Sequence, residues 1–224
     1  MPSLTVENYV KAIYQLTGGH ADEAAATGQI AAALAVSPGT VTSMLKTLSE
    51  SGLAAYTRHQ GVALTPAGAA LALRVIRRHR LIELFLVKTL GLTWDEVHEE
   101  AEHMEHAVSD LLVDRIDAYL GHPAADPHGD PIPRADGTVQ PLASRNLAQC
   151  GVGDRFVLAR VLDQSPEFLR YLTESGLSLG THGTVTANRA EAGIVTISLR
   201  RQENPQEITL GRVAAERILV TADR

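Results

Sequence analysis

The chain has 224 residues, 45% of them hydrophobic and only 4% aromatic, so it can form two or three modest domains with cores of Ala, Leu and Val. The composition excludes a membrane-spanning helix, because no apolar stretch approaches the roughly 20 residues that one needs, and we expect no secretory signal peptide at the start. The single cysteine, Cys150, excludes an intramolecular disulfide and indicates a reducing cytoplasm.

The net charge of −6 argues at first against a nucleic-acid partner, but its distribution along the chain is uneven. Residues 1–80 hold seven Lys and Arg against four Asp and Glu, whereas residues 81–150 hold four against 13. Residues 151–224 are balanced, with nine of each kind. The first segment is therefore suited to a polyanion, and the second is suited to cations.

The first segment predicts a helix-turn-helix. Apolar residues recur at helical spacing over residues 4–17, and Thr27 is a suitable cap for a short second helix. Ser37 and Pro38 are a natural N-cap and first residue for a third helix, which Gly52 is well placed to end. Two short helices joined by a tight turn, the second starting with small polar residues, are typical of this DNA-binding motif.

The next elements are two short strands with a turn between them, 53–57 and 62–65. They predict a β-wing beside the helix-turn-helix. A long apolar helix is expected over 66–90, because Thr65 and Pro66 form a second cap-and-proline start. A further helix rich in Glu and His is expected from Thr93 or Asp95 to about Leu120.

Residues 121–146 hold five of the ten prolines, and we interpret them as an extended linker rather than a packed element. The remainder changes to strand-like periodicity, with a short helix at 166–175 and a last helical turn at 214–218. The expected strands are 155–161, 183–187, 194–199 and 207–210. Short strands separated by Gly turns predict a small β-barrel.

The stretch from 98 to 106, HEEAEHMEH, indicates metal-binding chemistry. On a single helix, four of its residues share about a third of the circumference: His98, Glu102, Glu105 and His106. His79 and Glu83 form a second such pair, one helical turn apart on the preceding helix. A divalent cation would offset the repulsion between the carboxylates by binding their oxygens together with neutral imidazoles. For any one residue, a solvated acidic face remains the alternative.

The predicted recognition helix places small hydroxyl side chains where DNA would lie. Hydroxyls donate to phosphates or base edges, and a Thr methyl can contact a thymine methyl. Two basic residues nearby are suited to phosphates. The candidate DNA-binding residues are Ser37, Pro38, Thr40, Thr42, Ser43, Lys46 and Arg58.

With these residues identified, the chain resembles the diphtheria-toxin-repressor family of bacterial metal-dependent transcription regulators, whose members respond to iron or manganese. The resemblance covers essentially the whole chain. The segments that carry it are ENYVKAIYQL, LAVSPGTVTSMLKTLSESGLA, LTPAGAALALRVIRRHRLIELFL, VHEEAEHMEH, the PIP of the linker, SLGTHGTVT and EITLGRVAAERILV.

The resemblance implies a mainly α fold with a small β domain, in three parts. Residues 1–73 would form a winged helix-turn-helix DNA-binding domain. Residues 74–140 would form a helical metal-binding and dimerisation domain, with the Pro-rich linker starting at 121. Residues 141–224 would form a C-terminal SH3-like (FeoA-type) β-barrel. The family's mechanism implies that metal favours the DNA-competent arrangement of a homodimer.

The resemblance also assigns candidate metal ligands. Those matching the family's primary site are Glu102, Glu105 and His106, and those matching its ancillary site are His79, Glu83 and His98. Further oxygen ligands would come from Gln164 and Glu167 in the SH3-like domain.

The chain departs from the family pattern at three positions. The N-terminal helix commonly supplies Met or Asp as a ligand, where this chain has the weaker donor Asn8, with Glu7 beside it. Manganese-responsive members carry Glu where this chain has Lys11, which cannot coordinate. Iron-responsive members carry Cys where this chain has Glu102, and losing the thiolate favours Mn²⁺, with Fe²⁺ as the alternative.

The sequence thus predicts a cytoplasmic bacterial repressor of metal homeostasis that binds a palindromic double-stranded DNA operator as a homodimer. We expect no enzymatic activity, no membrane partner and no small organic substrate. Two alternatives stay open: a metal-dependent hydrolase that uses the Glu/His cluster, and a winged-helix regulator that needs no metal and responds to a small molecule.

Overall fold

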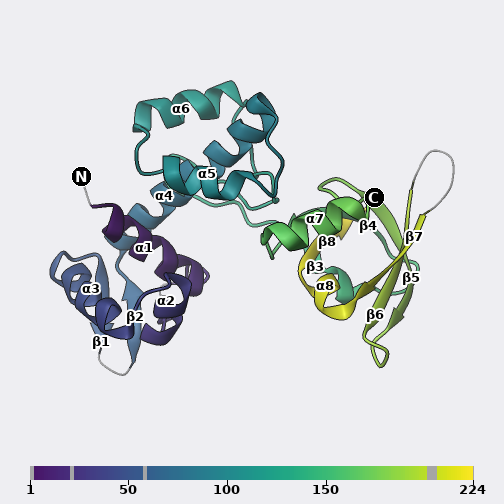
Figure 1. Cartoon of the computed structure of the whole chain (residues 1–224), viewed down its shortest axis with the longest axis horizontal. Coiled ribbons are helices and arrows are strands. Elements are labelled where there is room, and N and C mark those ends of the chain that lie inside the picture. Colours follow the sequence, from purple (N-terminus) through teal and green to yellow (C-terminus); the bar gives the residue numbers. More distant parts are fainter. Residues whose placement is uncertain (1–2, 21–22, 58–59, 201–205, 224) are drawn as a thin grey trace. The chain divides into compact units, whose positions relative to one another are not determined.

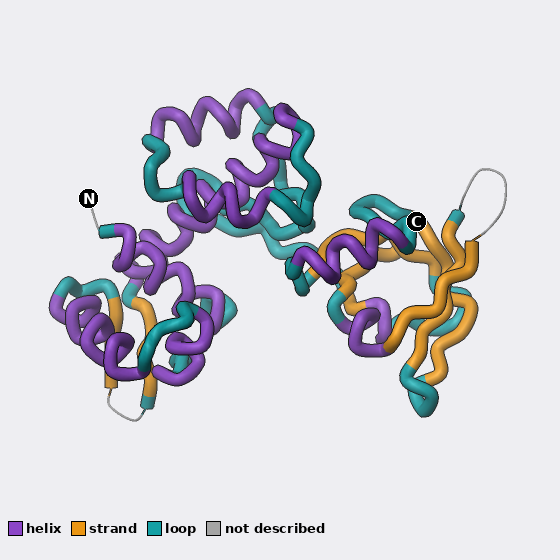
Figure 2. The backbone as a smooth tube through the Cα atoms, viewed as in Figure 1, coloured by secondary structure: helices purple, strands orange, loops and turns teal. Residues whose placement is uncertain are grey.

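The computed structural model describes residues 3–20, 23–57, 60–200 and 206–223. It divides into two compact units. Figure 1 colours and labels its elements in chain order, and Figure 2 distinguishes helices from strands. The first unit consists of residues 1–79, 102–114 and 133–139, and the second of 80–101, 115–132 and 140–224. The fold is mainly α with a small β domain, as predicted. No helix within the described ranges has the length and apolar character to cross a bilayer.

The first unit begins with the predicted winged helix-turn-helix. Its elements are α1 (Leu4–Leu16), α2 (Thr27–Ala33), α3 (Pro38–Glu50), β1 (Ala54–Thr57) and β2 (Gly61–Leu64). The three helices bury a shared apolar core that includes Ile13, Ile30 and Leu45. The hydroxyl of Ser37 accepts a hydrogen bond from the Thr40 amide and so caps α3 as expected. The strands pair antiparallel to form the wing.

The predicted cap of the second helix is wrong by one residue. Ala26 occupies the N-cap position of α2, and Thr27 is already helical. The side chain of Gln29 supplies the missing partner, because its Oε1 accepts a hydrogen bond from the Ala26 amide at 2.9 Å. This contact reaches back from the third helical position, as in one half of a capping box.

The long helix α4 (Pro66–Phe85) continues as a π-helical turn, η1 (Leu86–Leu90), and ends at Gly91, whose φ is 73°. The single Glu/His helix expected from about 94 to 120 is wrong. The chain instead forms α5 (Val97–Met104) and α6 (Asp110–Tyr119), with a turn between them. Ser109 starts the second of these helices, because its hydroxyl accepts from the Leu112 amide at 3.2 Å.

The interpretation of residues 121–146 as an unpacked linker is also wrong for its central part. Asp126 to Asp130 are all buried. The Asp126 carboxylate accepts from the amides of His128 and Asp130, at 2.8 and 2.9 Å, which folds the segment into a compact turn. We call residues 126–130 the buried loop. Its proline and glycine shape a tight turn rather than a spacer.

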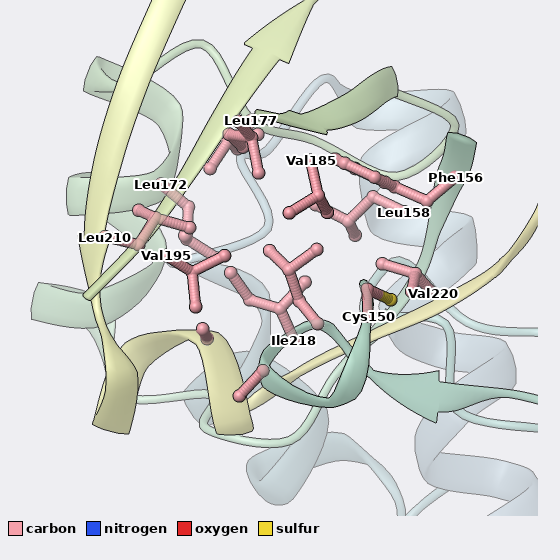
Figure 3. Close-up of a cluster of buried hydrophobic side chains, with 14 of the residues drawn as sticks. Cys150, Phe156, Leu158, Leu172, Leu177, Val185, Val195, Leu210, Ile218 and Val220 are labelled. Atoms are coloured by element: carbon pink, nitrogen blue, oxygen red, sulfur yellow. The ribbon is translucent and has the colours of Figure 1, made fainter. Parts of the chain in front are cut away.

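The second unit contains the predicted small β domain, an antiparallel sheet in the order β3-β8-β4-β5-β6-β7. Its strands are β3 (Arg145–Asn146), β4 (Arg155–Val161), β5 (His182–Arg189), β6 (Ile194–Leu199), β7 (Gln206–Gly211) and β8 (Ile218–Ala222). The helices η2 (Leu147–Gln149), α7 (Pro166–Glu174) and α8 (Arg212–Glu216) complete it. Figure 3 shows its core, with Phe156, Val195 and Ile218 fully buried. Two strands, β3 and β8, were not predicted.

The buried loop should depend on Gly129. A Cβ at this position would lie 2.1 Å from the Ala159 carbonyl oxygen, and φ is already +86°. Gly121 has a similar φ of +76° but open space around it. We expect Gly121→Ala to cost about 1 kcal/mol through backbone strain alone, and Gly129→Ala to cost about 2 kcal/mol more through overpacking. Urea unfolding of both variants measures the difference, and equal losses would contradict this packing.

Candidate metal centres

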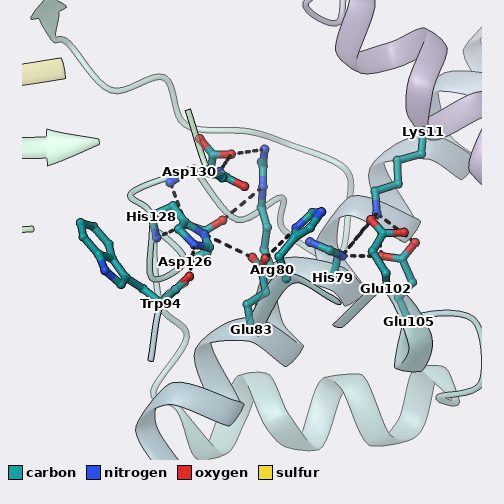
Figure 4. A network of polar contacts seen from close by, with 12 residues as sticks. Lys11, His79, Arg80, Glu83, Trp94, Glu102, Glu105, Asp126, His128 and Asp130 are labelled. Carbon is teal, nitrogen blue, oxygen red and sulfur yellow. Dashed lines mark hydrogen bonds and ion pairs between the residues drawn. The ribbon is translucent and has the colours of Figure 1, made fainter. Parts of the chain in front are cut away.

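The second unit buries three potential metal ligands together, and we call them the buried triad. Glu83 comes from α4, and Asp126 and His128 come from the buried loop (Figure 4). The His128 Nδ1 lies 3.8 Å from Oε2 of Glu83 and 3.9 Å from Oδ1 of Asp126. One ligand atom from each residue lies within 4.8 Å of the others, and their side chains are at most 1% exposed.

The orientation of His128 leaves one ring nitrogen for a ligand. Its Nε2 lies 2.7 Å from the Trp94 carbonyl oxygen, which can only accept, so Nε2 carries a proton. The opposite nitrogen, Nδ1, is buried and has no hydrogen-bond partner in the structure. The Trp94 indole also stacks on the imidazole, with ring centroids 6.4 Å apart. A nitrogen held in this way is well suited to bind a cation.

The triad concentrates negative charge that the protein only partly neutralises. Burial, together with the charges of Asp130 and Glu83, raises the pKa of Asp126 to about 7. Burial opposes the charged form of His128, but the Glu83 carboxylate outweighs it and raises the His128 pKa. The Arg80 guanidinium lies 3.7 Å from Asp126. Carboxylate oxygens and an imidazole nitrogen are the ligands that Mn²⁺ and Fe²⁺ accept, so these residues fit a hard divalent cation.

Three further predicted ligands lie in the same unit, the ancillary ligand His98 and the two oxygen ligands Gln164 and Glu167. The His98 Nδ1 is 3.4 Å from Oε1 of Glu83, with its side chain 47% exposed, so the structure brings this predicted pair together. Gln164 donates from Nε2 to the Asp130 carboxylate at 3.1 Å, beside the buried loop. Glu167 is exposed and lies 3.8 Å from Arg170. Their roles as ligands stay predictions.

The first unit holds a second polar cluster, centred on the ammonium group of Lys11, and we call it the lysine cluster (Figure 4). Lys11 Nζ lies 2.7 Å from Glu102 Oε1, and 3.0 and 2.8 Å from the two oxygens of Glu105. It also lies 3.3 Å from His79 Nδ1. His79 Nδ1 is in turn 2.6 Å from Glu105 Oε2. Glu105 is fully buried, whereas Glu102 is 38% exposed.

The remaining predicted ligands surround the lysine cluster. The Glu7 carboxylate lies 2.7 Å from His106 Nδ1, so it orients the imidazole rather than competing for its other nitrogen. His106 Nε2 lies 3.2 Å from Glu105 Oε1 and makes no hydrogen bond in the structure. The Oδ1 atom of Asn8 is also buried without a hydrogen-bond partner. Glu105 and His106 follow the end of α5, so the turn, and not a shared helix face, positions them.

The predicted DNA-binding residues lie on and just before α3. Most are exposed, namely Ser37, Pro38, Thr40, Ser43 and Lys46. Thr42 is half-buried and donates to the Pro38 carbonyl at 2.9 Å, so its hydroxyl is already used within the helix. Arg58 lies outside the described residues.

Sequence reasoning missed Asp126 and His128 as candidate ligands. The available signal was their spacing, D-x-H, followed by a glycine in a segment with several carboxylates. The proline content of residues 121–146 indicated an extended linker instead. Lys11 was recognised as unable to bind metal, but its contacts with Glu102 and Glu105 were not foreseen.

Comparison with known proteins gives three successive matches to protein families. Residues 1–62 match "Iron dependent repressor, N-terminal DNA binding domain", and residues 65–134 match "Iron dependent repressor, metal binding and dimerisation domain". Residues 145–222 match "FeoA domain".

Individual relatives agree with these matches. The iron-dependent repressor IdeR of Mycobacterium leprae (strain TN) is 36% identical over 132 residues, 58% of this chain and only 55% of that relative. The HTH-type transcriptional regulator MntR of Lysinibacillus sphaericus (strain C3-41) is 34% identical over 52% of this chain and 81% of its own length. A solved structure, a manganese-dependent transcriptional repressor complex with manganese, is 41% identical with a TM-score of 0.87, covering 97% of this chain and 99% of that one.

The buried carboxyl of Asp126 should make the metal-free protein less stable as the pH rises. Its pKa is about 7 in the folded protein against an ordinary value of 3.8, so the stability that its proton provides is lost as the pH rises through 7. With a chelator present, Asp126→Asn should therefore lose less stability than the wild type between pH 6 and pH 8. Urea unfolding at both pH values measures this.

The exposed Asp136 provides a matched carboxyl-to-amide control. Hydrogen bonds from the backbone and side chain of Thr138 hold its pKa below the ordinary value, so it does not titrate in this range. Asp136→Asn should follow the wild type. If Asp126→Asn also followed it, the buried carboxyl would not be the source of the pH dependence.

Proposed function

Because the chain belongs to the iron-dependent repressor family, we propose that it is a metal-dependent transcription regulator that binds a palindromic DNA operator as a homodimer. The site of action is then the cytoplasm, where the operator lies. The three-part division at residues 73 and 140 is part of this proposal. The relatives are named as repressors or transcriptional regulators rather than enzymes, so the hydrolase alternative is not favoured.

The observation that carries the proposal is the unpartnered His128 Nδ1 facing two buried carboxylates. Burying a nitrogen atom without a hydrogen bond costs folding free energy, and so does burying two carboxylates side by side. Neither arrangement improves the packing of the core. A bound divalent cation supplies the positive charge that satisfies all three groups. Trp94 fixes the ring orientation of His128, and Arg80 offsets part of the charge on Asp126.

We propose Mn²⁺ as the activating metal, with Fe²⁺ as the alternative. The described candidate ligands are carboxylate, amide and imidazole groups, and the chain's one cysteine, Cys150, is buried in the core of the β domain. Without a thiolate, the donor set does not favour softer metals. A similar solved structure contains manganese, whereas other relatives are named as iron-dependent, so both metals belong in the test.

On DNA, we propose that α3 enters the major groove. Its buried side chains, Val41, Leu45 and Leu48, anchor one face in the core, and the opposite face carries Ser43 and Lys46 in solvent. Hydroxyl groups and one lysine favour phosphate positioning over bidentate base contacts. The basic balance of residues 1–80 supports the same assignment.

Operator affinity measured with and without metal tests the proposal. The probe is a labelled duplex selected from a random library by the purified protein in the presence of Mn²⁺. Fluorescence anisotropy should show at least roughly tenfold tighter binding with Mn²⁺ than with a chelator, a usual allosteric coupling. His128→Gln should lose most of this difference. Lys46→Ala should weaken binding in both conditions, because it removes a phosphate contact and no metal ligand.

Equal wild-type affinity in both conditions would overturn metal dependence and leave the metal-independent winged-helix regulator. Repeating the titration with Fe²⁺ under anaerobic conditions decides between the two metals.

The proposed dimer requires an apolar contact surface, and α6 carries a candidate. Leu111 and Leu112 are 70% and 47% exposed on this helix. Replacing both with Glu should convert the dimer to a monomer without unfolding it, as light scattering and circular dichroism would show. Leu162→Glu, at a 49% exposed leucine of the β domain, is the control. If the variant with Glu at both leucine positions remained dimeric, the dimer interface would not lie on α6.

A further inference from the structure

The lysine cluster has the composition of a metal site but already contains a cation. His79, Glu102 and Glu105 bring ligand atoms within 4.8 Å of one another, which is a geometry that can hold a metal ion. Lys11 Nζ lies within 3.3 Å of an atom of each of these residues. The ammonium group thus occupies the position where a metal ion would meet all three. These residues do not fit a metal while Lys11 remains in place.

We propose that the Lys11 ammonium is the resident cation of this cluster and replaces a metal ion there. This inference rests on the proposed function. It means that the ion pair between Lys11 and Glu105 connects α1 to the turn after α5 without any metal. The metal response then comes from the remaining ligands. The chain would accordingly bind one metal ion fewer than the same cluster without the lysine.

The chemistry of the lysine side chain suits this role. An ammonium group offers three hydrogen-bond donors and no acceptor, which matches the carboxylate oxygens of Glu102 and Glu105. The Lys11 side chain is 9% exposed and Glu105 is fully buried, so the contact is largely shielded from salt and water. Removing one partner of such a pair leaves an uncompensated buried charge, which is strongly destabilising.

The cluster also retains two buried polar atoms without a hydrogen bond next to the lysine. One ammonium against the carboxylates of Glu102 and Glu105 leaves one negative charge in excess. His106 Nε2 lies 3.2 Å from Glu105 Oε1 and makes no hydrogen bond. The His106 side chain is only 9% exposed. Asn8 Oδ1 is unpartnered as well. A single metal ion next to His106 is compatible with the lysine, whereas two ions in the cluster are not.

The test compares Lys11→Met with wild type in two measurements. In a chelator, Lys11→Met should lower the melting temperature by several degrees, because it strands Glu105 without its counter-ion. In Mn²⁺, equilibrium dialysis with metal analysis should show one additional bound ion per chain. Lys11→Arg keeps the charge and should bind as many ions as wild type. Lys88→Met, at an exposed lysine of η1, is the matched control for losing an ammonium group.

A double variant keeps the proposal falsifiable if Lys11→Met does not fold. Lys11→Met with Glu105→Gln removes both opposite charges and should regain much of the lost melting temperature. An unfolded double variant would contradict a charge-based role for Lys11. If Lys11→Met folds, an unchanged melting temperature in chelator would also overturn the proposal.

Failure of the proposed function has a different signature. If wild type binds no Mn²⁺ at all, metal regulation is wrong, yet the melting temperatures in chelator still decide whether Lys11 neutralises the cluster. If wild type binds Mn²⁺ and Lys11→Met gains none, the proposed function stands and the role of Lys11 is refuted.

Discussion

A carboxylate that folding removes from water must be matched by positive charge, and this requirement governs the lysine cluster and the buried triad. The lysine cluster meets it internally, because Lys11 reaches Glu105 within the first unit. The buried triad brings two carboxylates together, and the Arg80 guanidinium lies 3.7 Å from that of Asp126. The lysine cluster thereby already contains a cation, whereas the buried triad is suited to bind an external one. A protein that senses metal needs the second kind.

Much of the fold follows from local signals. The caps at Ser37 and Gly52 and the Thr65-Pro66 start act over three or four residues, so the winged helix-turn-helix and the start of α4 were predictable. The break between α5 and α6 was missed because helical periodicity continues across it. A cap at Ser109 interrupts the helix there, and periodicity alone does not register a cap.

The candidate site was only half predictable, because burial is a tertiary property. Composition made residues 121–146 resemble a spacer, yet the Asp126 carboxylate folds five of these residues into the buried loop. Glu83 and His98 were identified from helical spacing and do lie together. Asp126 and His128 lie far from Glu83 in sequence, and no local pattern places them beside it.

The stacking of Trp94 on His128 gives the protein an intrinsic fluorescence probe. Trp94 is the chain's sole indole, its ring lies nearly parallel to the imidazole at 11°, and its carbonyl oxygen accepts a hydrogen bond from His128 Nε2. Indole fluorescence is sensitive to an adjacent charged imidazole. Ultraviolet emission from the unlabelled protein therefore responds to the charge on His128, with no engineered dye.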